Sequence, residues 1–517
     1  AMTSTPTGAA LTGATLLVGV QAGSRLASFV LNQLVVARMA PEAYGLAAVS
    51  LQLALSTVLF LAREPLRRAA LRMAAAPADA RALAAWGLPI GLVLAACLAA
   101  HSLILAPDPA AAAVPGAASA LGLTLAAAAV ELAAEPLYVA VLLEARYVVR
   151  AQIEAVGVLL RCIVTYAGVV AAGAGVVSFA LGHLAYAGVV LVGYLMAGSG
   201  FALSEAIPRA GPLVRHSPLV SALAAQTVLK YALTYGESII LVAVQSLYDQ
   251  GVFALVNNLG SLVARVIFQP VEETALNAFS LAGRDRNSTA RYGLLTVLCK
   301  GMVSIGLLFA TFGPPYAHLL LELLYGTRWV ATDAPAILAW YSLYVGFMAL
   351  NGVTEAYLHG CASKAGLARL NWMLLVFSVA YIIAGLASTT YAGTVGLIAA
   401  NMFNMAQRIT YSLYAIYVTL PNDGVPLPTG AALWDLVPSP PVWAAFGVAA
   451  AAAHGSAAAW VKLDSDGCYG SWTQRAVHVA PGVLGLLVVA AAFVACEREL
   501  VPALKRLIKL RRGGKTE

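Results

Sequence analysis

Residues 21–32 read QAGSRLASFVLN, and residues 226–237, which lie 205 positions later, read QTVLKYALTYGE. The polar positions align without a gap: Gln21 with Gln226, Arg25 with Lys230, and Asn32 with Glu237. The same offset aligns QLALSTVLFLAREP at 52–65 with NNLGSLVARVIFQP at 257–270. Because an amide, a cation and a proline return in register, the stretch indicates a duplicated pair of helices and a chain built from two related halves.

The composition places these helices in a membrane. The chain is 61% hydrophobic and 11% charged, with a mean hydropathy of +0.82, whereas soluble domains average about 45–50% apolar and about 25% charged residues. Apolar runs of about 20 residues, enough to span a bilayer core, recur along the chain. We expect an all-α polytopic membrane protein with about 14 transmembrane helices. These segments start near Ala9, Glu42, Leu83, Ala112, Ala151, Val176, Leu219, Val252, Leu294, Ala336, Asn371, Thr394, Val442 and Val479.

The repeat predicts how the segments are grouped. Segments 1–6 form an N-lobe (1–210) and segments 7–12 a C-lobe (211–420), so that both halves start on the same side of the membrane and are parallel repeats. A second match supports this division, because ELAAEP and NGVTEA align with Glu135 on Glu355. Residues 421–517 hold a Pro-rich link, segments 13 and 14 and a basic tail. We expect two pseudo-symmetric six-helix lobes plus two C-terminal helices.

The net charge of +7 is mostly a topology signal. Lys and Arg concentrate in the loops after even-numbered segments and in the tail KRLIKLRRGGK (505–515), while the other loops carry few. The positive-inside rule therefore predicts that both termini are cytosolic. The same distribution argues against a nucleic-acid partner, and it favours contact of the tail with anionic membrane lipid.

Polar residues inside the first segment share one helical face. Gln21, Arg25, Ser28 and Asn32 follow the spacing i, i+4, i+7, i+11, and segment 7 nearly repeats it up to Glu237. Such a stripe on the leading helix of each half predicts a wet central cleft. Hydrogen bonding between packed helices is the alternative, but it fits poorly with a cation at the same site in both halves.

The ends of segments 2 and 8 differ in charge. Segment 2 ends in FLAREPLRRAALR (60–72), where Glu64 and Arg68 have the spacing of an intrahelical bridge. Segment 8 ends in ARVIFQPVEETA (264–275). Residues related by a pseudo-two-fold approach each other near the axis, so we expect a gate between the lobes in which Arg67 or Arg68 pairs with Glu272 or Glu273. The residues of this predicted gate are Glu64, Arg67, Arg68, Gln269, Glu272 and Glu273.

Three carboxylates, Glu131, Glu135 and Glu355, lie in or near segments 4 and 10. Ionisable groups in membrane segments are costly and mark functional sites. These carboxylates either pair with cations or titrate in proton coupling, and the abundance of cations favours pairing. The candidate partners are Arg25, Lys230, Arg265 and Arg408. In segment 12, Asn401, Asn404 and Arg408 share a face that is typical of a cavity or an interface.

Soluble-enzyme motifs are absent from the sequence. It has no GxxxxGK[ST] and no HExxH, and its six cysteines show no metal-ligand spacing. We therefore expect no enzyme activity, no metal and no cofactor. Transport would run on a gradient or be passive.

Several stretches resemble one family. RLASFVLNQLVVAR (25–38), FLAREPLRRA (60–69), ELAAEPLYV (131–139), DQGVFALVNNLGSLVARVIFQPVEE (249–273), NGVTEAY (351–357) and NMFNMAQRITYSL (401–413) keep the order and spacing of the eukaryotic dolichol-linked oligosaccharide translocation family of the endoplasmic reticulum. That family belongs to the multidrug/oligosaccharidyl-lipid/polysaccharide exporter superfamily. The resemblance implies two lobes in a V around a hydrophilic cleft.

The resemblance also implies a function and a partner. It implies a flippase-type transporter in N-linked glycosylation that helps a mannosylated oligosaccharide-diphosphate-dolichol to reach the lumenal leaflet. Membrane lipid and enzymes of the pathway would be further partners. One alternative is a non-transporting accessory or lipid-binding protein of the same pathway. Another is a cation-coupled drug exporter, which would need an acidic, aromatic-lined pocket.

The substrate chemistry assigns roles to the polar residues. A diphosphate needs cations, and a glycan needs a wet, polar cleft. The predicted diphosphate and glycan site consists of Arg25, Asn32, Arg63, Lys230, Glu237, Asn257, Asn258, Arg265 and Arg408.

Overall fold

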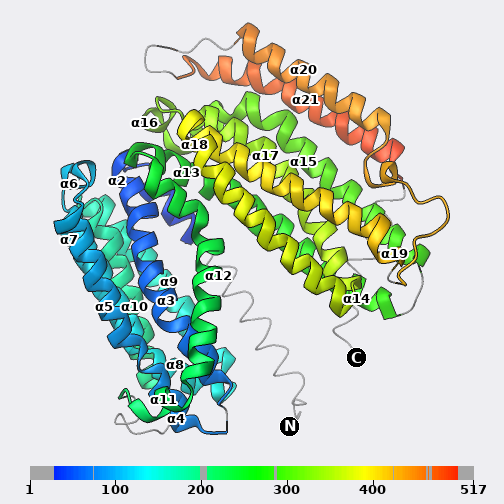
Figure 1. Cartoon of the computed structure of the whole chain (residues 1–517). Coiled ribbons are helices and arrows are strands. Elements are labelled where there is room, and N and C mark those ends of the chain that lie inside the picture. The colour runs from blue at the N-terminus through cyan, green and yellow to red at the C-terminus, as the bar shows by residue number, and fades with distance from the viewer. Residues whose placement is uncertain are drawn as a thin grey trace, which may run out of the picture. The chain divides into compact units, whose positions relative to one another are not determined.

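The computed structural model describes residues 28–73, 75–197, 207–284, 288–422, 424–460, 464 and 468–498. Every regular element within these residues is a helix (Figure 1), which confirms the predicted all-α class. The chain divides into two compact units, Ala1–Gly251 and Val252–Glu517. Each unit is described by itself.

Twelve helical spans among the described residues are long and apolar enough to cross a membrane. They are Pro41–Leu71, Pro77–Leu105, Ala117–Leu143, Tyr147–Ala171, Val177–Met196, Ser217–Val244, Leu247–Leu281, Ser288–Tyr325, Ala334–Cys361, Lys364–Asn422, Pro440–Trp460 and Trp472–Cys496. Their starts follow the predicted segments closely. The first predicted segment, near Ala9, lies mostly outside the described residues, so the total of about 14 stays a prediction.

The longest span contains two of the predicted segments. Its helix α18 (Lys364–Tyr414) leaves helical geometry at Ala392, with φ −124° and ψ 15°, and at Gly393, with φ +56° and ψ −142°. Only glycine adopts such a positive φ at little cost. The break therefore falls where the sequence predicts segment 12 to begin, near Thr394.

The first unit is a bundle of membrane-spanning helices with short connecting elements. Its elements are α2 (Pro41–Gly45), η1 (Leu46–Leu51), α3 (Gln52–Leu71), α4 (Pro77–Ala84), α5 (Gly87–Ala100), η2 (His101–Leu105), α6 (Pro109–Ala113), α7 (Ala117–Ala133), α8 (Glu135–Leu143), α9 (Tyr147–Tyr166), η3 (Ala167–Ala171), α10 (Val177–Met196), α11 (Ala210–Arg215) and α12 (Ser217–Val244). Here η1, η2 and η3 are π-helical turns that continue their neighbours.

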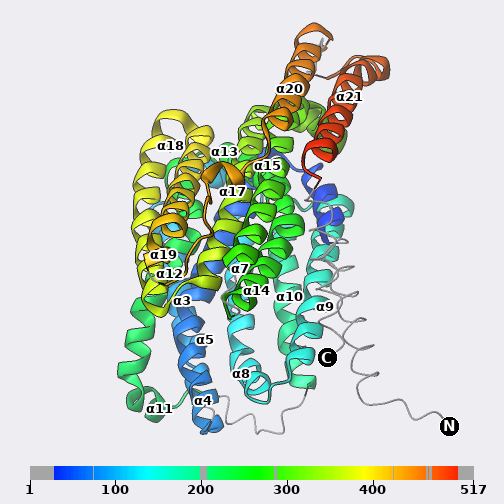
Figure 2. The same ribbon diagram turned by 90° about the vertical axis from the view of Figure 1, so that its right-hand side faces the viewer.

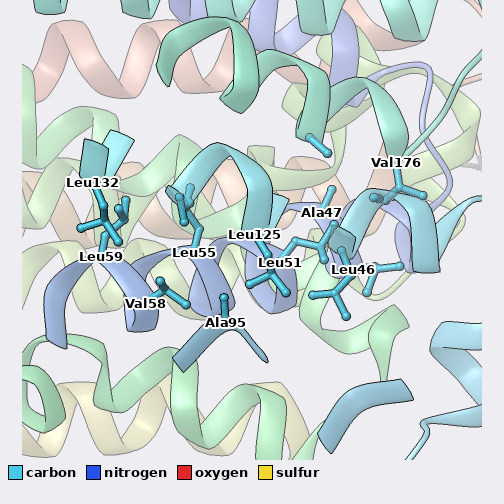
Figure 3. Close-up of a cluster of buried hydrophobic side chains, with 14 of the residues drawn as sticks. Leu46, Ala47, Leu51, Leu55, Val58, Leu59, Ala95, Leu125, Leu132 and Val176 are labelled. Carbon is cyan, nitrogen blue, oxygen red and sulfur yellow. The ribbon is translucent and has the colours of Figure 1, made fainter. Parts of the chain in front are cut away.

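Helix α3 lies at the centre of this unit, packed against α5, α7 and α12. Leu55, Val58 and Leu59 of α3 are buried with Leu125 and Leu132 of α7 (Figure 3). Lipid tails are as apolar as leucine, so close packing rather than exclusion from water stabilises such a contact inside a membrane. This packing fixes the polar face of α3 that is described below.

Helix α12 joins the first unit through α3 and α2. Phe60 of α3 contacts the rings of Tyr231 and Tyr235. At the start of α13 (Leu247–Val263) the backbones nearly touch, because a Cβ on Gly251 would lie 1.9 Å from the carbonyl oxygen of Pro41 and one on Gly45 would lie 2.0 Å from that of Leu247. Only glycine permits this approach, which fixes the start of α13 against α2.

The second unit continues from the rest of α13. Its elements are η5 (Ala264–Phe268), α14 (Gln269–Arg284), α15 (Ser288–Tyr325), α16 (Thr327–Val330), α17 (Ala334–Cys361), α18, η6 (Ala415–Thr419), α19 (Leu420–Asn422), η7 (Leu433–Leu436), α20 (Pro440–Trp460) and α21 (Trp472–Cys496). Helix α17 packs against α14, α15 and α18. Helices α20 and α21 lie side by side and pack on α15 through α20 (Figure 2).

Two ion pairs attach this last helix pair to α15. Lys300 Nζ lies 3.0 Å from Glu497 Oε2, just past the end of α21. Arg475 Nη2, at the start of α21, lies 2.5 Å from Glu322 Oε1. The backbone N–H of Ser439 also donates to Glu497, at 2.7 Å. The two glutamates are buried, so each carboxylate is compensated by a cation of its neighbour.

Candidate functional site

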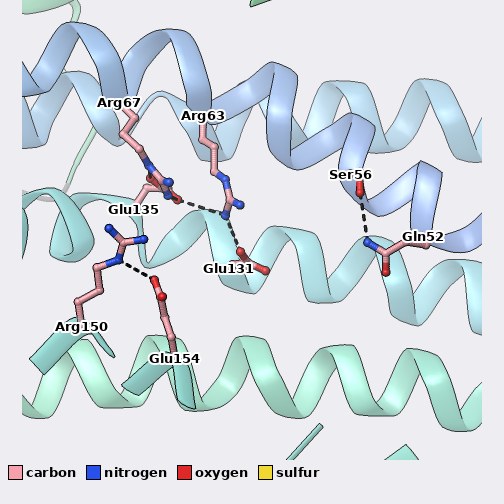
Figure 4. A network of polar contacts seen from close by, with 8 residues as sticks. All are labelled: Gln52, Ser56, Arg63, Arg67, Glu131, Glu135, Arg150 and Glu154. Carbon is pink, nitrogen blue, oxygen red and sulfur yellow. Dashed lines mark hydrogen bonds and ion pairs between the residues drawn. The ribbon is translucent and has the colours of Figure 1, made fainter. Parts of the chain in front are cut away.

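Two arginines of α3 meet two glutamates of α7 and α8 within the membrane span. Arg63 Nη1 lies 2.5 Å from Glu131 Oε1 and 3.5 Å from Glu135 Oε1 (Figure 4). Arg67 holds Glu135 with two nitrogens: Nε donates to Oε2 at 3.1 Å, and Nη2 donates to Oε1. The Glu135 side chain is only 4% exposed. A buried carboxylate with a bidentate arginine partner is well compensated, and removing either partner would leave an unpaired charge.

An aromatic ring extends this network. The Arg67 guanidinium lies over Tyr138 of α8, 3.9 Å from the ring centroid. Arg150 of α9 lies 5.2 Å from the same centroid, and its Nε donates to Glu154 Oε1 at 2.8 Å (Figure 4). Tyr138 therefore takes part in two cation–π contacts. The side of α3 that faces α8 and α9 is thus held by charge and ring contacts together.

A third carboxylate, Glu64, faces α12. Its Oε1 accepts from Lys230 Nζ at 3.2 Å and also lies 3.4 Å from Arg68 Nε. The Lys230 side chain is 49% exposed and lies 5.6 Å from the ring centroid of Phe60. Next to it, the hydroxyls of Thr57 and Tyr231 are 2.5 Å apart. The single carboxylate of Glu64 therefore pairs with two cations, Lys230 and Arg68, and the Lys230 side chain is about half exposed.

The second unit has an equivalent centre around Glu355 of α17. Arg408 Nη2 donates to Glu355 Oε2, and Asn351 Nδ2 donates to the same oxygen at 3.1 Å. His359 Nε2 lies 3.7 Å from Oε1. The sequence aligns Glu355 with Glu135. In both units the glutamate at this position forms an ion pair with an arginine. Arg408 was one of the four cations considered as partners; for Glu131 and Glu135 the partners are Arg63 and Arg67, which were not among them.

The predicted polar residues of α13 and η5 lie on one stretch of the second unit. Tyr341 Oη donates to Asn257 Oδ1 at 2.8 Å. The Nδ2 of Asn258 is buried with no hydrogen-bond partner among the described residues. Arg265 is exposed and bonds within its own helix, to the carbonyl oxygen of Ser261 at 3.2 Å and to its hydroxyl at 3.1 Å.

The predicted gate residues have partners within their own units. Arg67 binds Glu135 and Arg68 lies beside Glu64, as above. Gln269 Nε2 donates to Glu273 Oε1 at 2.9 Å, and the Glu272 carboxylate packs against Gly352. The bridge from Arg67 or Arg68 to Glu272 or Glu273 is untested by these contacts and stays a prediction.

The remaining predicted residues belong to the predicted segments 1 and 7. Arg25 and Gln21 fall outside the described residues. Asn32 is half-buried and lines a cavity of the first unit. Glu237 is half-buried on α12 and has an interaction partner. No group of three or more His, Cys, Asp or Glu side chains within the described ranges is placed to hold a metal ion.

The sequence analysis missed two features of the site. The pairing of α3 with α7 and α8 has a signal, because Arg63 and Arg67 are four positions apart and so are Glu131 and Glu135. Residues four positions apart lie on one face of a helix, so these two pairs of opposite charge can meet when the helices lie side by side. The other feature is Arg161 of α9, a cation inside an apolar segment, which lines the same cavity as Asn32.

Solved structures share this fold. The inward closed conformation of the lipid II flippase MurJ matches with a TM-score of 0.59 at 13% identity, covering 94% of this chain and all of that one. An inward-facing MATE family transporter of the MOP superfamily matches with a TM-score of 0.50 at 16% identity, covering 78% of this chain and 96% of that one. At these identities the likeness is one of fold, and it agrees with the predicted all-α class.

Relatives in sequence are closer. A protein of Xenopus tropicalis named Man(5)GlcNAc(2)-PP-dolichol translocation protein RFT1 is 31% identical over 511 residues, covering 92% of each chain. A protein of the same name from Yarrowia lipolytica is 34% identical, and the match covers 78% of this chain and 69% of that protein. Another from Mus musculus is 33% identical, and the match covers 76% of this chain and 79% of that protein. The Rft-1 family, described as Rft protein, matches residues 9–507. The chain therefore belongs to the Rft-1 family.

Proposed function

We propose that the protein is a flippase-type transporter of Man5GlcNAc2-PP-dolichol that acts in N-linked glycosylation at the endoplasmic reticulum membrane. Relatives that carry this substrate in their names align over most of the chain. The substrate combines a glycan, a diphosphate and a polyprenyl tail. A multi-pass helical protein with charges inside its spans offers surfaces for all three.

The observation that carries the proposal is a charge surplus in the first unit. The network on α3, α7, α8 and α12 contains the cations Arg63, Arg67, Arg68 and Lys230 and the carboxylates Glu64, Glu131 and Glu135. Four cations thus face three carboxylates. The surplus lies at Glu64, whose single carboxylate serves both Lys230 and Arg68. A diphosphate can take over these two cations, because it offers them more charge and more acceptor oxygens than Glu64 does.

Other predicted residues extend this surface. Arg265 bonds only to oxygens of its own helix in the described contacts, and no carboxylate neutralises it there. Arg408 already holds Glu355 and would have to exchange partners. The amides of Asn32, Asn257 and Asn258, with Glu237, supply hydrogen-bonding groups that suit sugar hydroxyls.

Orientation and location complete the proposal. In the first unit α4, α8 and α11 lie at one end, away from α2 and α6 (Figure 1). The loops at this end carry the Lys and Arg residues that predict the cytosolic side. Both termini would then be cytosolic, and the basic tail would contact the anionic cytosolic leaflet.

The lobes and the gate remain part of this proposal. We keep two repeat-derived lobes, 1–210 and 211–420, which rock to expose the site alternately. The bridge between Arg68 and Glu272 would need Arg68 to leave Glu64. Arg68→Glu and Glu272→Arg should each impair complementation of cells that lack the protein, and the double exchange should restore it. Failure of the double exchange beside two stable single variants would overturn the bridge.

A reconstitution experiment tests the function. Purified protein is placed in liposomes with a defined Man5GlcNAc2-PP-dolichol, and binding and transbilayer movement are scored separately. Lys230→Gln should weaken binding about three- to tenfold, since it removes one charge-assisted contact. Arg215→Gln is the matched control, because the exposed Arg215 lies on α11 outside the membrane spans and pairs with Asp79.

The outcomes separate the hypotheses. Binding with movement, both reduced by Lys230→Gln, supports the transporter. Binding without movement, in protein that complements cells, would favour the accessory lipid-binding protein. Absence of binding would refute both the site and the substrate.

A further inference from the structure

The first unit contains a polar cavity of about 170 Å³ whose described lining shares one residue, Asn32, with the site proposed above. It lies between the residues around Asn32, the start of α3, α9 and α10. Its polar and aromatic lining consists of Asn32, Tyr44, Gln52, Arg161, Cys162, Thr165, Phe179 and His183. This volume is many times the roughly 10–15 Å³ that a cavity needs to hold a single water. A phosphate or diphosphate group fits such a space together with some of its hydration.

Among the described lining residues, Arg161 is the one with a permanent charge. It is ten residues from the nearer end of its span, Tyr147–Ala171, which at about 1.5 Å per residue is about 15 Å and close to mid-membrane. None of the described lining residues is a carboxylate. Within the described ranges Arg161 forms no ion pair, in contrast to Arg150 of the same helix, which holds Glu154 at 2.8 Å.

The segment before Asn32 does not supply the missing charge. Residues 1–27 contain neither Asp nor Glu, so no side-chain carboxylate from that segment can neutralise Arg161. The immediate neighbours are neutral hydrogen-bonding groups: Thr165 and His183 are buried, and Gln52 keeps one amide hydrogen beyond the one given to Ser56. A cation held at mid-membrane among neutral polar groups is costly unless a partner arrives.

We propose that this cavity is a binding site for a phosphate-class anion, with Arg161 as its charged ligand and Gln52, Thr165 and His183 as hydrogen-bonding partners. A planar guanidinium matches two phosphate oxygens at once, and the amide, hydroxyl and imidazole groups can satisfy the others. Its charged ligand, Arg161, is not one of the cations assigned above. It stands whether or not the protein moves lipid, because the argument uses only the charge and lining of the cavity.

The test uses Cys162, which lines the cavity and so reports on its occupancy. In a variant whose other cysteines are replaced by serine or alanine, we expect an anionic methanethiosulfonate reagent to modify Cys162 faster than a cationic one. Inorganic pyrophosphate should slow this modification in a saturable manner. Arg161→Gln should remove both effects, and Arg161→Lys should retain part of them. Arg150→Gln should change neither, because Arg150 is neutralised by Glu154.

Direct binding provides a second measurement on the natural cysteine background. Radiolabelled pyrophosphate should bind the full chain in nanodiscs about tenfold more weakly after Arg161→Gln. Comparison of pyrophosphate with dolichol diphosphate shows whether a free anion suffices or the lipid anchor is needed. Pyrophosphate binding that is lost with Lys230→Gln but kept with Arg161→Gln would overturn the proposal. So would a Cys162 that neither anion protects.

Discussion

Lys230 of α12 donates to Glu64 of α3 over 3.2 Å, while Arg68 approaches the same carboxylate oxygen. Both helices belong to the first compact unit. The contact is partly exposed on the lysine side, so it is weak compared with the buried pairs around it. A ligand with more negative charge would therefore displace Glu64 here before it displaced Glu135.

Replacing Glu64 with Gln should strengthen binding of the diphosphate lipid. The carboxylate competes with the ligand for Lys230 and Arg68, and exposed pairs contribute about 0.2–1 kcal/mol, so we expect a gain of about two- to fivefold. Equilibrium binding of Man5GlcNAc2-PP-dolichol to protein in nanodiscs measures this. The control is Asp79→Asn, which removes a carboxylate from the exposed pair with Arg215. A weaker affinity for Glu64→Gln would show that Glu64 organises the site instead of competing for it.

Glu135 is expected to be essential for stability. Its removal leaves Arg67 without its bidentate partner at a nearly buried site, and breaking such a pair costs about 3–5 kcal/mol. We expect Glu135→Gln to lower Tm in detergent much more than Glu154→Gln, whose pair with Arg150 is more exposed. The double variant Arg67→Met/Glu135→Gln should lose less than the two single variants together, because the charges vanish as a pair. Additive losses would indicate that the two residues act independently.

The close approach of α2 to the start of α13 predicts a steric effect. An alanine at Gly251 would place its Cβ 1.9 Å from the carbonyl oxygen of Pro41, and such overpacking costs about 1–3 kcal/mol or more. Gly122→Ala is the control, because nothing lies within 4 Å of a Cβ there and alanine favours a helix by about 1 kcal/mol. In thermal unfolding, the alanine at Gly251 should lower Tm and Gly122→Ala should raise it. Equal Tm values would contradict the contact.

Glu497 gives a pH dependence. Burial opposes its ionisation, but the N–H of Ser439 and the ammonium of Lys300 outweigh burial and hold the pKa of Glu497 below its ordinary value. The stabilisation that ionised Glu497 contributes is therefore complete when the pH is above the ordinary glutamate pKa of about 4.3. It is lost as the pH falls through the lower pKa that Glu497 has in the folded state. Tm measured from about pH 6 to about pH 3 should fall more steeply for the natural chain than for Glu497→Gln. At neutral pH this variant should lose about 2 kcal/mol. Parallel Tm curves would refute the role of Glu497.

The membrane spans could be predicted because their signal is local. A run of about 20 apolar residues spans a bilayer whatever its neighbours are, so the starts near Glu42, Leu83 and Val442 agree with Pro41, Pro77 and Pro440. A division of α18 is also predicted, because segments 11 and 12 are expected to start separately, near Asn371 and Thr394. The positive φ of Gly393 places that break at a particular residue.

Partner choice inside the membrane could not be predicted in the same way. Glu131 and Glu135 were expected to bind a cation, but the sequence does not say that α3 passes beside α7 and α8. The repeat likewise aligns α12 with the first segment without saying that Lys230 reaches Glu64 on α3. A role for Arg161 could not be predicted, because this residue has no counterpart in the repeat. Only the cavity that it lines indicates one.

Two ion pairs with equal spacing along the chain fix the position of the last two helices against α15. Lys300 and Glu322 are 22 positions apart on α15, and Arg475 and Glu497 are 22 positions apart along α21 in the opposite direction. At about 1.5 Å per residue this separation is about 33 Å, close to the thickness of the hydrocarbon core. A slip by one helical turn would break both pairs at once. A chain that terminates before α20 would leave Lys300 near one membrane surface and Glu322 near the other without these ion-pair partners, so truncated products should fail to mature.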